Sequence, residues 1–241
     1  MATQPAARGM PHPRTRSWPL LLPIGVFLAL LVAVRVNAVV PSADEAFRAW
    51  VHAHQRPAVA RLSLALTQIG SPWASVIVLL LVAVAMAKRR GNLGPILLAA
   101  IGVCAVAGTV LPIKALVARP GPGLMHRHVA TGYFPSGHTA TAFVCYGAMG
   151  VLVRLGDPRG RRLEPLLWGW GAALPVGAAM VYSDFHWLSD VLASFALGAA
   201  LVWLLVNAAP HLVPHGGSAP RGSWTILRPR PPARSSVRPE S

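Results

Sequence analysis

The chain has 241 residues, of which 54% are hydrophobic and only 12% are charged. An ordinary soluble domain carries roughly 25% charged residues, so this composition excludes that class and favours an integral membrane protein. The formal net charge of +15 would suit nucleic acid, but the basic residues fall in short clusters between apolar runs, so we expect no nucleic-acid partner.

Six apolar runs are long enough, or nearly long enough, for the roughly 20-residue helix that crosses a bilayer. In chain order they cover 20–40, 73–87, 93–113, 139–153, 166–182 and 187–206. The second and fourth runs are short and are expected to borrow residues from the segments that flank them. We therefore predict an all-α fold, an integral membrane bundle of six transmembrane helices that occupies 18–209.

The basic clusters predict the orientation of this bundle. They stand before the first run, after the second, after the fourth and in the C-terminal tail, and fifteen of the 22 basic residues lie on that one side. By the positive-inside rule this side is cytoplasmic, so we expect a multi-pass protein of the cell membrane with both termini inside. The N-terminal tail, 1–17, and the C-terminal tail, 210–241, are then cytoplasmic, and the composition of the C-terminal tail predicts disorder.

The first outer connection contains the sequence SADEAFRAWVHAHQ, at 42–55. Ser42 and Glu45 stand at the spacing of a capping box, which predicts that a helix begins at Ser42. One face of this helix gathers apolar side chains, namely Ala46, Phe47, Trp50 and Val51. We predict an amphipathic helix that lies at the interface after the first span and covers the outer mouth of the bundle.

Polar residues gather at the predicted outer ends of the third, fourth and sixth runs: Lys114, Arg119, Ser136, His138, His186 and Asp190. Ionisable groups near membrane depth are costly and usually face a cavity or one another, so this convergence predicts a functional site. Each residue also has a purely structural interpretation: a helix-capping His–Asp pair, a serine N-cap, or basic anchors at the interface.

The chemistry of these groups favours phosphoryl transfer without a metal or another cofactor. His186 and Asp190 are four residues apart at a helix start, so the carboxylate can hold one imidazole nitrogen and leave the other for a substrate. The backbone N–H groups where Ser136, Gly137 and His138 lead into a helix favour an anion. In such a site one histidine attacks phosphorus, the other protonates the leaving oxygen, and the cations neutralise the phosphate oxygens.

These residues resemble the membrane branch of the type 2 phosphatidic acid phosphatase (PAP2) superfamily. Its three motifs are Lys-x6-Arg-Pro, Pro-Ser-Gly-His and Ser-Arg-x5-His-x3-Asp, and the likeness is most specific in PSGHTATA, 135–142, and HWLSDV, 186–191. The resemblance implies a six-helix membrane fold and a metal-free phosphohistidine mechanism. It also implies catalytic roles for His186 as nucleophile, Asp190 as its orienting carboxylate and His138 as general acid.

The same resemblance implies a phosphate-binding group made of Lys114 with Ser136 and Gly137. Both motif arginines are absent: Gly121 stands at the first position, and Met180 at the second. Arg119, two residues ahead of the first vacant position, is the predicted substitute that binds phosphate.

The resulting function prediction is a membrane phosphatase that acts at the outer leaflet on a lipid phosphate or diphosphate. The substrate classes that the resemblance implies are undecaprenyl diphosphate, phosphatidic acid and phosphatidylglycerol phosphate. Two alternatives remain open: a catalytically impaired family member that binds an anionic lipid or a partner, and a small transporter. A transport path needs polar groups at several depths, whereas Arg35 is the one charged residue within a predicted span apart from Asp190, which lies at the outer end of the sixth run.

Overall fold

The computed structural model describes residues 18–36, 39–123, 132–155 and 163–213, and the regular structure in these ranges is helical. The helices, in chain order, are α1 (Trp18–Arg35), α2 (Val39–Ala53), α3 (Pro57–Ile69), α4 (Pro72–Arg90), α5 (Gly94–Val117), α6 (Gly137–Arg154), α7 (Glu164–Tyr182) and α8 (Leu188–Leu212). An apolar segment forms helices in a membrane because a helix satisfies its backbone hydrogen bonds within the segment.

Five of the six predicted apolar runs each form one long helix. The first run, predicted over 20–40, is too long: α1 ends at Arg35, and Val39 with Val40 begins α2. The two short runs are extended by polar residues at their ends: α4 begins after the N-cap Ser71 and ends at Gly91 in the left-handed conformation. The helix α6 begins after the N-cap Ser136 and continues to Arg154. The capping residues explain these bounds, because they satisfy backbone groups that the apolar pattern ignores.

Three of the described helices, α4, α5 and α8, are each long and apolar enough to cross a membrane. The segments Leu20–Arg35 and Val40–Ala53, bent by 92° to one another, make a fourth crossing if they are counted as one broken span. Large apolar side chains cover the outside of the bundle, including Leu21, Leu81 and Leu167. These features are typical of a membrane protein. The count of six spans stays a prediction.

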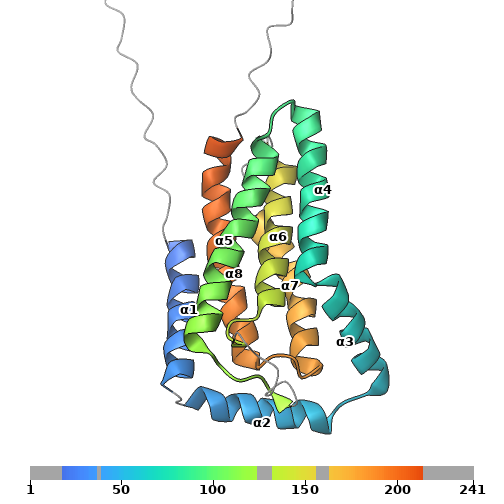
Figure 1. The fold of residues 1–241 in the computed structure, drawn as a ribbon, viewed down its shortest axis with the longest axis vertical. Coiled ribbons are helices and arrows are strands. Elements are labelled where there is room, and N and C mark those ends of the chain that lie inside the picture. The colour runs from blue at the N-terminus through green and yellow to red at the C-terminus, as the bar shows by residue number, and fades with distance from the viewer. Residues whose placement is uncertain (1–17, 37–38, 124–131, 156–162, 214–241) are drawn as a thin grey trace, which may run out of the picture.

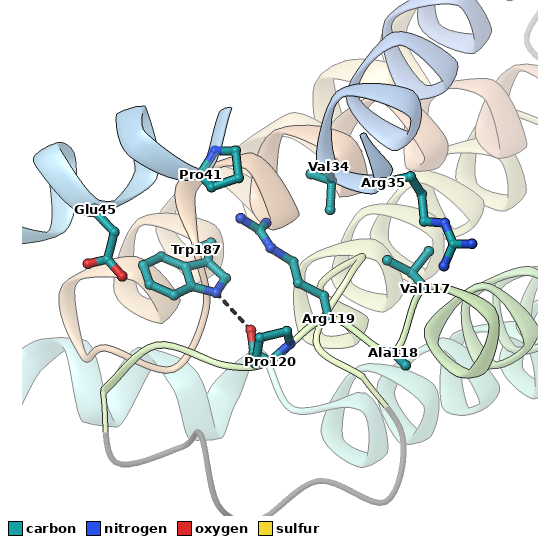
Figure 2. Close-up of a pocket in the computed structure, with 9 residues that line it drawn as sticks. All are labelled: Val34, Arg35, Pro41, Glu45, Val117, Ala118, Arg119, Pro120 and Trp187. Atoms are coloured by element: carbon teal, nitrogen blue, oxygen red, sulfur yellow. Dashed lines mark hydrogen bonds between the residues drawn. The ribbon is translucent and has the colours of Figure 1, made fainter. Parts of the chain in front are cut away.

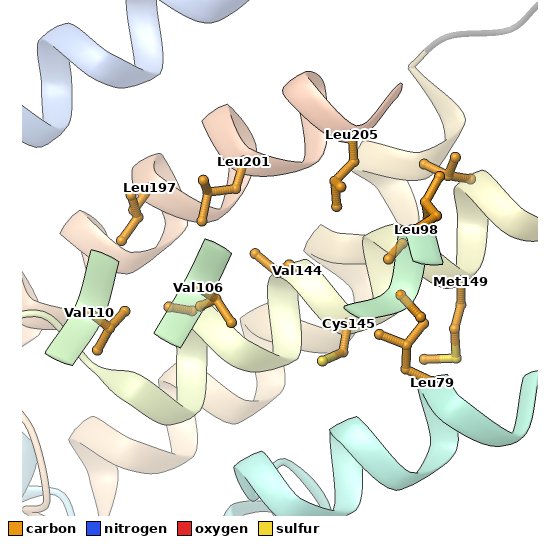
Figure 3. Packing of buried hydrophobic residues seen from close by; sticks show 14 of the residues in the cluster. Leu79, Leu98, Val106, Val110, Val144, Cys145, Met149, Leu197, Leu201 and Leu205 are labelled. Atoms are coloured by element: carbon orange, nitrogen blue, oxygen red, sulfur yellow. The ribbon is translucent and has the colours of Figure 1, made fainter. Parts of the chain in front are cut away.

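The long helices stand side by side, with α6 at the centre of the bundle (Figure 1). It is buried along most of its length and contacts α4, α5, α7 and α8. Small residues make this close packing possible: the ring of Phe143 on α6 touches the backbone at Gly169 of α7 and Gly198 of α8, where an added Cβ would meet ring atoms at 2.6 Å. The largest cluster of buried side chains joins α4, α5, α6 and α8 (Figure 3).

The helix α2 crosses one end of the bundle (Figure 1), which agrees with the predicted cover. It begins at Val39, so the predicted capping box is wrong: Ser42 lies inside the helix and cannot be its N-cap. The helical turn includes Pro41 near its start, where a proline costs no hydrogen bond.

The sequence analysis missed α3 as a separate helix. Pro57 opens it, and Gly70 with Ser71 separates it from α4. At the other end of the chain, α8 continues to Leu212, so 210–212 are helical and not part of a disordered tail. The remainder of the predicted C-terminal tail after residue 213, and the predicted N-terminal tail, lie outside the described residues.

Candidate active site

The start of α8 holds the first pair of predicted site residues. Nδ1 of His186 lies 3.2 Å from Oδ2 of Asp190, and the backbone N–H of Trp187 donates to the same oxygen at 3.2 Å. Asp190 is fully buried, and His186 is 8% exposed. The four-residue spacing explains the pairing. Because Nδ1 is bound to Asp190, Nε2 is the ring nitrogen left for a substrate.

Burial keeps the imidazole of His186 neutral. Removal from water lowers the pKa of His186 below its ordinary value of about 6.5, and the hydrogen bond and charge of Asp190 oppose this shift. The positive charges of Lys114 and Arg119 lower the pKa of His186 further. A neutral imidazole at pH 7 has the free electron pair that a nucleophile or a base needs.

The start of α6 is tied directly to this pair. Ser136 is the N-cap of α6, and its hydroxyl accepts from the backbone N–H of Thr139 at 3.4 Å. Its own backbone N–H donates to the carbonyl of Asp190 at 3.2 Å. The Oγ of Ser194 lies 2.9 Å from the carbonyl oxygen of Ser136 and 2.7 Å from that of Asp190. These contacts hold the first turns of α6 and α8 against each other.

Lys114, near the end of α5, lies beside the start of α6. Its Cε is 3.8 Å from the place where a Cβ on Gly137 would stand. Its Nζ donates to the carbonyls of Gly132 at 3.0 Å and Tyr133 at 3.2 Å. The ring of Tyr133 in turn meets the ring of His186 edge to face, with centroids 5.4 Å apart.

His138, the second residue of α6, lies within electrostatic range of both His186 and Lys114. The structure thus gathers the predicted residues of the three helices at one end of the bundle: Lys114, Ser136, Gly137, His138, His186 and Asp190. The backbone N–H groups of Gly137 and His138 are among the first in α6, where a helix has no internal acceptors for them. A negatively charged group is therefore favoured beside the imidazoles.

Arg119 lies on the other side of Asp190. Its Nη1 donates to Oδ1 of Asp190 at 2.5 Å and to Oγ of Ser189 at 2.7 Å, and its Nη2 donates to Oδ2 of Asp44 at 2.6 Å. The side chain is 8% exposed. The guanidinium is therefore engaged by carboxylates, and its predicted role as a phosphate ligand stays a prediction.

The profile of the PAP2 superfamily matches residues 93–213, which is half of the chain. The chain belongs to the PAP2 superfamily. Its fold is similar to the crystal structure of a transmembrane PAP2 type phosphatidylglycerolphosphate phosphatase from Bacillus subtilis, with a TM-score of 0.67 at 23% identity. The alignment covers 80% of this chain and 98% of that one. Among curated proteins, none matches this chain by sequence.

The two vacant arginine positions of the PAP2 motifs have different surroundings. Gly121 packs against the ring of Tyr133. Met180 is 2% exposed in an apolar cluster with Phe143 and Val176, while its carbonyl accepts from the backbone N–H of His186 at 3.2 Å. The backbone at position 180 therefore holds the histidine loop, and the side chain serves the core. Arg127, another basic residue ahead of the second motif, lies outside the described residues.

Sequence reasoning missed Asp44, which stands between the two residues of the predicted capping box. Asp44 is 4% exposed, and it accepts hydrogen bonds from Arg119 and Ser189. The signal was its register on α2, because Asp44 precedes the buried Val51 by seven residues and so shares its face. A carboxylate on the inward face of an amphipathic helix requires a buried partner.

Asp184, two residues before His186, is neutralised by α2. The guanidinium of Arg48 donates to both of its oxygens, at 2.7 and 3.0 Å, and Nε2 of His52 lies 3.5 Å from Oδ2. The hydrogen bond with Asp184 raises the pKa of Arg48 above its ordinary value. The charge of Asp184 is therefore balanced outside the PAP2 site.

A pocket of about 320 Å³ opens beside Arg119, between α1, α2 and the end of α5 (Figure 2). Trp187 forms part of its wall and donates from Nε1 to the carbonyl of Pro120 at 2.9 Å. The same indole lies 5.4 Å from the guanidinium carbon of Arg119, within cation–π distance. The segment Arg119–Pro120 is thus held from both sides, by Trp187 and by the carboxylates.

Proposed function

We propose that this PAP2 protein is a membrane phosphatase that hydrolyses a lipid phosphate or diphosphate at the outer leaflet through a phosphohistidine intermediate. The observation that carries the proposal is the pair His186–Asp190, with its burial and its attachment to the start of α6. A buried neutral imidazole beside the first N–H groups of a helix and a lysine has the properties of a nucleophile facing a phosphate.

In the proposed reaction Nε2 of His186 attacks phosphorus, and the bond from phosphorus to the leaving oxygen breaks. His138 donates a proton to that oxygen, and Asp190 stabilises the positive charge that His186 acquires. Water then attacks the phosphohistidine, His138 accepts a proton from it, and phosphate leaves with His186 neutral again. Lys114 and the backbone N–H groups of Gly137 and His138 stabilise charge on the phosphoryl oxygens.

The membrane setting supports a lipid substrate. Apolar side chains cover the bundle, and the site lies at the end of the bundle that α2 crosses (Figure 1), so a lipid headgroup would reach it from the interface. Undecaprenyl diphosphate, phosphatidic acid and phosphatidylglycerol phosphate are the classes to compare. The Bacillus subtilis neighbour is a phosphatidylglycerolphosphate phosphatase, which makes that lipid the first to assay.

The test is phosphate release by purified protein in detergent, with each of the three lipids and with EDTA present. We expect release to be abolished in His186→Ala and retained in His54→Ala, because His54 is exposed in the turn after α2 and contacts only Trp50 among the described rings. Phosphohistidine predicts inhibition by vanadate at about 1 mM or below, because vanadate adopts the five-coordinate geometry of the transition state. Full activity of His186→Ala would refute the mechanism.

The absence of the motif arginines favours one alternative, a family member that binds an anionic lipid without hydrolysing it. Each lost contact to a phosphoryl oxygen costs on the order of 3 kcal/mol in the transition state. Saturable lipid binding without phosphate release would support that alternative. Ion flux in proteoliposomes, with neither binding nor release, would instead support a transporter.

A further inference from the structure

A line of buried charges connects α2 with the imidazole of His186. Asp44 accepts from Arg119, Arg119 donates to Asp190, and Asp190 holds Nδ1 of His186. Asp44, Arg119 and Asp190 are 4%, 8% and 0% exposed. Charges this far from water are retained only where each has a partner, and here one guanidinium lies between two carboxylates.

Ser189 strengthens the link between Asp44 and α8. Its backbone N–H donates to Oδ1 of Asp44 at 2.9 Å, and its hydroxyl donates to Oδ2 at 2.5 Å. Both oxygens of Asp44 are therefore bound to the first turn of α8 or to the arginine beside it. Asp44 lies on α2, outside the segment 93–213 that matches the family.

The charges explain why a second carboxylate is useful here. Arg119 alone would neutralise Asp190, and a neutralised Asp190 would stabilise a cationic His186 only weakly. With Asp44 present, the group of two carboxylates and one guanidinium has one net negative charge. That charge is available to the imidazole when it becomes positive during phosphoryl transfer.

We propose that Asp44 is a positioning residue for the nucleophile: it binds Arg119, holds the guanidinium against Asp190, and preserves the negative charge that Asp190 presents to His186. This inference rests on the proposed function. It assigns Arg119 to the support of Asp190, and it assigns to α2 a part in the reaction beyond covering the site.

Other charged or titratable groups also face this site, and all of them except Arg119 stay unchanged in the variants of the test. They come from α5, the segment after α5, the loop before α6, α6 and α8, and they are Lys114, Arg119, Tyr133, His138 and Asp190. Asp184 adds a charge in the adjoining loop, where Arg48 and His52 balance it.

The test compares the pH dependence of kcat/KM in three variants. Asp44→Asn keeps the shape and can still accept from Ser189, but it removes one negative charge, so the acid limb should move to lower pH by about one unit. We expect kcat to fall about 10-fold, with KM changed less than about 2-fold, because the substrate does not touch Asp44. In Asp44→Asn/Arg119→Gln the removed charges cancel, so the acid limb should return toward its wild-type position.

Glu45→Gln is the matched control. This neighbouring carboxylate on α2 is 60% exposed, and its ion pair is with Arg48 at 3.7 Å. We expect its acid limb and kcat to equal those of the wild type. The same shift is to be measured without turnover, by following the ¹⁵N imidazole signal of His186 in an NMR pH titration. His186→Ala assigns this signal, because the signal disappears in that variant.

The two measurements separate the inference from the proposed function. Absent phosphate release, or release by His186→Ala, refutes the proposed function while the imidazole titration still tests the role of Asp44. An unmoved titration and acid limb in Asp44→Asn, in protein that is folded, overturns the inference. If Asp44→Asn instead binds vanadate more weakly while the titration of His186 does not shift, the inference is also overturned, because Arg119 would then act on the phosphate and not on Asp190.

Discussion

A Cβ atom at position 121 would lie 2.6 Å from Cε2 of Tyr133, so the backbone of Gly121 rests directly on that ring. The ring of Tyr133 also contacts the imidazole of His186, with centroids 5.4 Å apart, and Nζ of Lys114 lies 5.8 Å from the same ring. Gly121 occupies the first vacant arginine position of the PAP2 motifs. The aromatic packing at this position therefore excludes the side chain that the motif expects.

Restoring the motif by Gly121→Arg should harm the protein. Any side chain at this position forces Tyr133 to move, and a displaced Tyr133 misplaces His186. We expect kcat/KM to fall by about 10-fold to 100-fold, because misplacement by about 1 Å is costly in an active site. Phosphate release and thermal unfolding in detergent measure the effect. A rise in turnover would show that the ring yields and that the guanidinium reaches phosphate.

The pH profile of the wild-type protein tests the state of His186. The nucleophile must be neutral, and burial places its pKa below the ordinary value, so activity should be kept at about pH 6.5 and lost only as the pH falls through the lowered pKa. The substrate phosphate ionises near pH 6 as well. The pH profile should therefore be measured with two substrates whose phosphate groups have different pKa values. A fall in activity at the same low pH with both substrates belongs to the enzyme. A common limb above about pH 6.5 would contradict the prediction.

The second vacant arginine position should reject a charge. Met180→Arg places a guanidinium among apolar side chains, and an unpaired buried charge costs about 3–5 kcal/mol or more. We expect loss of monodisperse protein in size-exclusion chromatography. Met180→Leu conserves volume and should cost less than about 1.5 kcal/mol. Well-folded, active Met180→Arg protein would mean that the side chain turns toward the site instead.

The ion pair between Arg48 and Asp184 should stabilise the attachment of α2 by a modest amount. The two side chains are 31% and 22% exposed, so solvent screens the pair and its coupling should be about 1 kcal/mol. A double-mutant cycle with Arg48→Ala and Asp184→Ala, followed by thermal unfolding, measures this coupling. Arg48→Ala should also lower kcat, because α2 carries Asp44. Zero coupling together with unchanged turnover would show that other contacts hold α2 in place.

The predicted orientation is open to a labelling experiment. In protein that also carries Cys104→Ala and Cys145→Ala, the new cysteine of His54→Cys should react with a membrane-impermeant maleimide on intact cells. The new cysteine of Asn92→Cys, beside the basic end of α4, should react only after permeabilisation, because basic clusters remain on the cytoplasmic side. The reverse labelling pattern would move the site to the inner leaflet.

The sequence alone determined the features that depend on neighbouring residues. Apolar runs predicted the long helices, the four-residue spacing predicted the contact between His186 and Asp190, and Ser136 predicted the start of α6. These features are local, since helix geometry places residues three or four apart on one face whatever surrounds them. The start of α2 escaped prediction because its first residues, Val39 and Val40, continue the apolar pattern of the first run. The separate helix α3 escaped prediction because Pro57, and not an apolar period, marks its start.

Only the tertiary structure decided the partners of the buried charges. Arg119 meets Asp44 and Asp190 across separations of 75 and 71 residues, and no local pattern encodes such contacts. The sequence offered Arg119 as a free cation near a phosphate, whereas packing of α2 across the bundle end brings a second carboxylate to it. A guanidinium withdrawn from water binds the carboxylates that the fold brings within reach, and that choice depends on the positions of α2 and α8 relative to α5.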